Sequence, residues 1–151
     1  MIKEFQGQYR WLSNFWPVAI MYGGDLYPSV EHAYQAQKSD DPKWRARCSD
    51  PRTPAGKIKK ESKTVHLDPY WDGHKLRIMH ELVTLKFSNR DLREKLLATG
   101  DQETREGNSW GDTFWGVDAK TGQGDNHLGD IIMRVRAVLQ AVENDIQLAV
   151  I

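Results

Sequence analysis

Cysteine is nearly absent from this chain of 151 residues, which contains only Cys48. A single cysteine cannot close a disulfide within the chain, so the sequence predicts a protein of a reducing compartment, the cytoplasm. The histidines show no spacing typical of metal ligands, because His74 and His80, six residues apart, would lie on different faces of a helix. We therefore expect no metal site and no cofactor.

An excess of charge of one sign and a long apolar run are also missing. Lysine plus arginine and aspartate plus glutamate both number 21, so no global field would attract nucleic acid or an anionic membrane. The longest apolar run, residues 16–22, is too short to span a bilayer, and the first residues do not resemble a signal peptide. With 28% charged and 39% hydrophobic residues, the chain is typical of one globular domain, residues 1–151.

Helix signals dominate the chain. Residues 18–27 are typical of a hairpin around Gly23-Gly24, and residues 113–117 of a short strand. Capping residues, prolines and apolar periodicity predict helices at 29–39, 43–48, from Thr53-Pro54 through 63, at 70–87, 91–98 and 127–144. Because helices and strands do not alternate, the sequence predicts a helix-dominated α+β domain with short N-terminal and central strands.

The first candidate site is the helix that begins after Ser29. Glu31, Tyr34, Gln35 and Lys38 share one face at spacings of three, four and seven, while small apolar residues occupy the other side. The positive end of the helix dipole should keep Glu31 ionised near neutral pH. An acid, a phenol, an amide and an amine together form one wall of a site, or else a solvated helix start.

Two loops are the other candidates. Asp112 lies between Trp110 and Trp115, and could orient a substrate hydroxyl or form a turn by accepting backbone N–H bonds. The glycine-rich loop 122–129 precedes a helix, where free N–H groups and the dipole favour phosphate, unless Asn126 is a simple N-cap. The basic run 57–63 is a solvated face or a phosphate contact.

Two carboxylates, indole platforms and a phosphate-binding helix start fit the cleavage of a ribosyl C–N bond. A carboxylate would stabilise the ribose oxocarbenium ion or activate water, while aromatic rings hold the departing base.

The ordered motifs of the chain resemble those of the NADAR, or YbiA-like, family. The likeness rests on Leu12-Ser13-Asn14-Phe15, the segment 29–38, Trp71 with Lys75 and Met79, Lys86-Phe87, the segments 96–100, 112–116 and 124–129, and Met133 with Arg136.

This resemblance implies an N-glycosidase that acts on phosphoribosylamino-pyrimidines of riboflavin synthesis, or that removes ADP-ribose from guanine in DNA and so pairs with a DNA ADP-ribosyltransferase toxin. It implies that Glu31 is the essential carboxylate, with Trp71 and Asp112 as further catalytic residues. We expect substrate contacts from Asn14, Tyr34, Lys38, Trp115, Gly116, Gly124, Asn126 and Gly129. At residues 55–57 the chain departs from the family's alanine…glycine-arginine pattern.

Two other classes of function compete with this prediction. One is a binding module for ADP-ribose or a related nucleotide without turnover, which would have little need of an ionised acid at the bound ribose. The other is a structural or interaction protein, which the polar helix face and the ordered motifs disfavour. No membrane partner is expected.

Overall fold

The computed structural model describes residues 1–150, which divide into two compact units. One unit is continuous and comprises residues 11–86, and the other combines residues 1–10 with residues from 87 onward. A short 3-10 helix, η1 (Gly7–Leu12), precedes the continuous unit. None of the helices in the described part of the chain is both long and apolar enough to cross a membrane.

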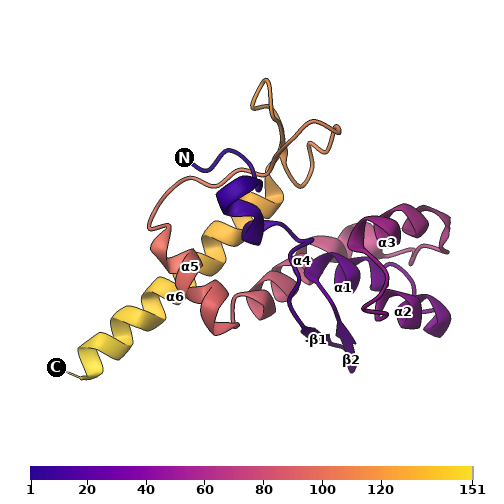
Figure 1. Cartoon of the computed structure of the whole chain (residues 1–151), viewed down its shortest axis with the longest axis horizontal. Coiled ribbons are helices and arrows are strands. Elements are labelled where there is room, and N and C mark those ends of the chain that lie inside the picture. The colour runs from indigo at the N-terminus through magenta and orange to yellow at the C-terminus, as the bar shows by residue number, and fades with distance from the viewer. Residues whose placement is uncertain (151) are drawn as a thin grey trace. The chain divides into compact units, whose positions relative to one another are not determined.

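The continuous unit is built around α1 (Val30–Ala36), whose seven residues are all buried. Ser29 caps this helix by accepting the backbone N–H of His32 at 3.2 Å. The hairpin β1 (Ile20–Tyr22) and β2 (Asp25–Tyr27) packs against α1, as do α2 (Pro42–Cys48), α3 (Ala55–Glu61) and α4 (Trp71–Lys86) (Figure 1). A single turn, η2 (Ser62–Thr64), extends α3. Because these elements surround α1, both its apolar and its polar residues are buried.

The discontinuous unit contains the longest helix, α6 (His127–Ala149), and α5 (Arg90–Ala98), which packs against it. Asn89 caps α5, and Gly100 follows its end with a positive φ of 63°, as the sequence predicts. The N-terminal segment joins this unit, because Ile2 exchanges backbone hydrogen bonds with Glu103 and Arg105. Two short parallel strands, β3 (Gly107–Asn108) and β4 (Val117–Asp118), complete it.

The helix-dominated α+β class is therefore confirmed, with two sheets of two strands each. The hairpin is confirmed as well, with Gly23 and Gly24 at positive φ in its turn. The strand predicted at 113–117 is wrong, since regular pairing begins only at Val117 and the partner strand β3 was not predicted. The predicted cap of α3 is also wrong: Pro54 holds the cap position, and no side chain caps the helix.

Candidate active site

Glu31 lies near the N-terminus of α1 with 6% of its surface exposed. Its backbone N–H donates to the carbonyl of Asn14 at 3.0 Å, which ties the helix start to the loop after η1. Its Oε1 accepts the side-chain N–H of Gln35 at 2.7 Å. The solvated helix start considered from the sequence is thus wrong, and Glu31 is a buried, hydrogen-bonded carboxyl group.

Burial raises the pKa of the Glu31 carboxyl, so the helix dipole does not determine its titration as the sequence analysis expected. The hydrogen bond from Gln35 and the electrostatic interactions with Lys59, Lys38 and His32 act in the opposite direction and lower that pKa. A carboxyl group under such opposing effects is typical of a functional site.

An aromatic pair lies beside this carboxyl on α1 and α4. The rings of Tyr34 and Trp71 are 5.0 Å apart at 58°, and both residues are buried at 5% exposure. The ammonium group of Lys38 lies 5.6 Å from the Tyr34 ring centre and 6.0 Å from that of Trp71. Trp71 therefore belongs to the core of the unit and also contacts the polar face of α1.

Three lysines, from the segment after α1 and from α3 and α4, bring positive charge to this face. Burial lowers the pKa of the Lys38 amine, Glu31 raises it, and the ammonium groups of Lys59 on α3 and Lys75 on α4 lower it further. Lys59 also lies 5.9 Å from the ring centre of Phe15. Sequence reasoning treated the basic run 57–63 as one group, and Lys59 is the member whose charge acts on both Glu31 and Lys38.

Two acceptor atoms of this cluster have no hydrogen-bond partner among the described residues. They are Oδ1 of Asn14 and Oε1 of Gln35, both fully shielded from solvent. The Asn14 amide N–H points to the sulfur of Met79 at 3.5 Å. Sequence analysis placed Gln35 on the face of Glu31 without giving it a role, although its spacing of four residues was the available signal.

Asp112 and the remaining predicted residues belong to the discontinuous unit. The Asp112 carboxylate accepts the backbone N–H groups of Phe114 and Trp115 at 3.2 and 2.9 Å, so the turn considered from the sequence is present. Trp115 packs edge-on against Phe114 with ring centres 4.9 Å apart, and Trp110 is 57% exposed. A catalytic role for Asp112 and a substrate contact from Trp115 stay predictions.

Four consecutive N–H groups at the start of α6 are used within the protein. They donate to loop carbonyls: Asp125 to Thr113, Asn126 to Gly116, His127 to Phe114 and Leu128 to Trp115, at 2.8–3.1 Å. These four are therefore not free for a phosphate, and a phosphate contact of the glycine-rich loop stays a prediction. Asn126 holds the N-cap position, as the alternative from the sequence has it, but its side chain does not cap the helix. Asn126 adopts a left-handed φ of 55°, and its side chain bonds the backbone of Glu106 and Thr104.

Close backbone packing requires glycine at three loop positions that were predicted to contact substrate. A Cβ atom on Gly116 would collide with the carbonyl of Glu106, one on Gly124 with the carbonyl of Gly116, and one on Gly129 with that of Thr104. These close backbone approaches bring segments 104–106, 113–116 and 124–129 together. A contact between these glycines and substrate stays a prediction.

Comparison of this chain with known proteins shows the family to which it belongs. A model described as the NADAR domain matches residues 2–140. The chain belongs to the NADAR family. It is 38% identical over 135 residues to an N-glycosidase of Nostoc punctiforme, covering 85% of this chain and 84% of that protein. It is 35% identical over 133 residues to the N-glycosidase YbiA of Escherichia coli, covering 84% and 79%.

A longer relative and a solved structure agree with this family. The chain is 39% identical over 132 residues to a riboflavin biosynthesis protein of Vibrio vulnificus, but it spans only 35% of that protein's length. The NMR structure of E. coli YbiA superposes with a TM-score of 0.78 at 29% identity, covering 95% of this chain and 89% of the other. This NADAR protein is accordingly an enzyme, a hydrolase of N-glycosyl compounds.

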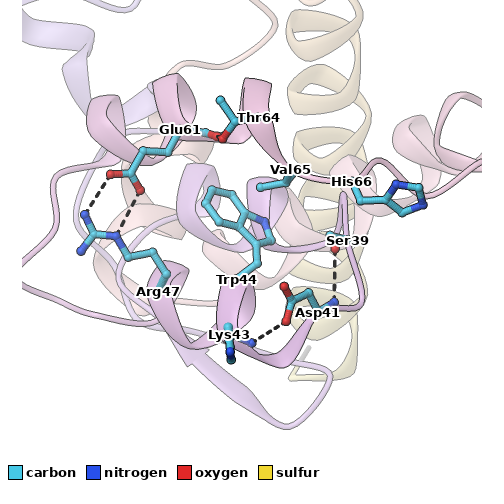
Figure 2. A pocket seen from close by; sticks show the side chains of 9 residues that line it. All are labelled: Ser39, Asp41, Lys43, Trp44, Arg47, Glu61, Thr64, Val65 and His66. Carbon is cyan, nitrogen blue, oxygen red and sulfur yellow. Dashed lines mark hydrogen bonds and ion pairs between the residues drawn. The ribbon is translucent and has the colours of Figure 1, made fainter.

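Away from these residues, the continuous unit has a hollow of about 460 Å³ (Figure 2). The Arg47 guanidinium on one side of it donates to both oxygens of Glu61, and Asp41 caps α2. Trp44 lines it and donates its indole N–H to the backbone carbonyl of Gln35 at 2.9 Å. None of the predicted site residues lines this hollow, so we assign it no catalytic role.

Within residues 1–150, no group of three or more His, Cys, Asp or Glu side chains lies close enough together to bind a metal ion. Cys48 is buried, and burial raises the pKa of its thiol to about 12. The thiolate nucleophile is thus strongly disfavoured at neutral pH. A catalytic role for Glu31 stays a prediction.

Proposed function

We propose that this enzyme hydrolyses the ribosyl C–N bond of a phosphoribosylamino-pyrimidine. The observation that carries the proposal is the buried Glu31 carboxyl, held by Gln35 and facing the positive charges of Lys38 and Lys59. A carboxylate of this kind can stabilise the positive charge that develops on the ribose ring as the bond breaks.

In this reaction the C1′–N bond breaks and its electron pair goes to the nitrogen of the base. The oxygen of a water molecule forms the new bond to C1′, and one proton from that water ends on the departing amine. The products are a free aminopyrimidine and ribose phosphate. Glu31 acts on the ribose cation or on the attacking water.

The lysines support a phosphate on the substrate. Burial is the largest cause of the lowered pKa of the Lys38 amine, and repulsion from the ammonium groups of Lys59 and Lys75 lowers that pKa further. A phosphate dianion would relieve this repulsion between ammonium groups. The Vibrio relative is named a riboflavin biosynthesis protein, which favours the pyrimidine intermediate over ADP-ribosylated guanine in DNA.

The test is incubation of the purified protein with each of the two substrates, following release of aminopyrimidine or of ADP-ribose by chromatography. We expect turnover of the phosphoribosylamino-pyrimidine. Release of ADP-ribose from modified DNA alone would replace this substrate by the DNA lesion and would favour a pairing with a DNA-modifying toxin. Release from neither would refute the proposal. We also expect EDTA to leave the rate unchanged, and loss of activity in EDTA that one divalent ion restores would contradict this expectation.

A further inference from the structure

Gln35 is held rigidly one helical turn after Glu31. Its exposed fraction is 2%, and its backbone carbonyl accepts the Trp44 indole N–H at 2.9 Å. It lies in the last turn of α1, a helix that packs against five other elements of the unit. Its side chain therefore has little freedom to choose among partners.

The orientation of the Gln35 amide follows from its neighbour. A carboxylate only accepts hydrogen bonds, so the amide must present Nε2 to Glu31 Oε1, at 2.7 Å. Its oxygen Oε1 then points elsewhere. That atom is buried and receives no hydrogen bond from any residue in 1–150. Buried acceptors in proteins are nearly always paired, so an unpaired one beside a reactive carboxyl requires an explanation.

The substrate supplies the missing donor. Building on the function proposed above, we propose that Gln35 bridges Glu31 and a ribose hydroxyl, donating its N–H to the carboxylate and accepting the hydroxyl proton on Oε1. The amide thus fixes the distance between the carboxylate and the sugar on which positive charge develops. It also selects a ribosyl compound over a sugar that lacks the bound hydroxyl. Gln35 is in this account a positioning and specificity residue.

Burial raises the pKa of the Glu31 carboxyl, and four neighbouring groups lower it, among them the Gln35 amide. His32 acts from α1, Lys38 from just beyond the end of α1 and Lys59 from α3, and all three favour the ionised form. A variant that removes only the Gln35 N–H leaves these charges in place. The pKa of Glu31 must then rise, and the acidic limb of the rate profile must move to higher pH.

The first measurement compares Gln35→Met with Gln37→Met. Gln37 is the next glutamine of the same helix, and its side-chain N–H donates to the Ala33 carbonyl at 3.1 Å instead of to Glu31. We expect Gln35→Met to lower kcat for the phosphoribosylamino-pyrimidine by roughly 10²-fold and to move the acidic limb upward. Gln37→Met should keep the wild-type rate and profile, and circular dichroism should confirm that both variants fold.

The second measurement uses Gln35→Glu. A protonated carboxylic acid offers one donor and one acceptor, as the amide does, so this variant should work while the new carboxyl is protonated. Ionisation beside Glu31 would remove the donor and add repulsion. As the pH rises, we therefore expect the activity of Gln35→Glu to fall at least about one pH unit earlier than the activity of the wild type falls. A purely structural role for Gln35 would not create this new limb.

Specificity provides the third measurement. The wild type should prefer the ribosyl substrate over its 2′-deoxy or 3′-deoxy counterpart by roughly 10²-fold, and Gln35→Met should lose most of that preference. An active wild type whose Gln35→Met and Gln35→Glu variants match Gln37→Met in rate, pH profile and sugar preference overturns this inference alone. A wild type that releases base from neither substrate class overturns the proposed function and this inference together.

Discussion

Two opposing effects act on the Glu31 carboxyl: the dipole of α1 favours its ionised form, and burial raises its pKa. Its place in the first turn of a helix was readable from Ser29 and the spacing that follows, and that place predicts an ionised carboxylate. Its burial was not readable, because the residues that cover α1 come from segments distant in the sequence. Dehydration then acts against the dipole and raises the pKa.

Replacing Glu31 by Gln should abolish most of the activity without weakening the fold. Turnover should fall by roughly 10²-fold or more, since an amide cannot stabilise the developing charge. Because the folded pKa of Glu31 is raised, burying its charge reduces stability above the ordinary pKa, and the neutral amide should raise Tm at pH 7. Calorimetry and initial rates test both effects. A rate within about threefold of the wild type would contradict the catalytic assignment.

Lys86 should make the free energy of unfolding depend on pH above neutrality. Its ammonium group donates to the Ser13 carbonyl at 2.7 Å, its exposed fraction is 1%, and burial lowers its pKa to about 7. The unfolded chain therefore binds more protons at this group between about pH 7 and pH 10. The free energy of unfolding should accordingly rise with pH in that range, by up to about 1.4 kcal/mol per pH unit from this group.

Urea titrations at pH 7, 8 and 9 measure this dependence, with Lys86→Met as the test variant. The variant should lose the rise. Lys75→Met is the matched control, because Lys75 lies on the same helix but is only half-buried. Equal slopes for Lys86→Met and the wild type would show that Lys86 is charged in the folded protein.

At the scale of elements, local signals located the helices well and the strands poorly. Asn89 caps the start of α5 and Gly100 follows its end, while Asp41 caps α2, which begins at Pro42. These signals are local, so the sequence contains them in full. The pairing of β3 with β4 is parallel and joins residues ten apart through a loop, which no local pattern encodes.

The second half of α6 should be dispensable. The buried residues of this helix lie between Leu128 and Arg136, and beyond Gln140 nearly every residue is exposed, including Ile146. Ending the chain after Val142 should change the free energy of unfolding by less than about 1 kcal/mol and leave turnover unchanged. Melting curves and light scattering test this. A large destabilisation, or a fall to a smaller assembly, would mean that another chain covers the apolar side chains of this segment.

For the whole molecule, the family match over residues 2–140 includes both compact units, and the predicted site residues are divided between them. Glu31, Tyr34, Lys38, Asn14 and Trp71 belong to the continuous unit, and Asp112, Trp115 and the glycines to the discontinuous one. Motif order revealed the family, and helical spacing placed Gln35 beside Glu31, while only folding revealed that Lys59 and Lys75 join the first group.

The single domain predicted for residues 1–151 should unfold in one transition despite its two units. Each unit has about 75 residues, a size at which a core alone is marginal, and one of them is assembled from two separate stretches of chain. Urea unfolding followed by far-UV circular dichroism reports on all helices. In the double variant Trp110→Phe/Trp115→Phe, fluorescence reports only on the continuous unit, which holds the other four tryptophans. One cooperative domain requires the two midpoints to agree within about 0.3 M urea, whereas a fluorescence midpoint clearly apart from the dichroism midpoint would establish two independently folding units.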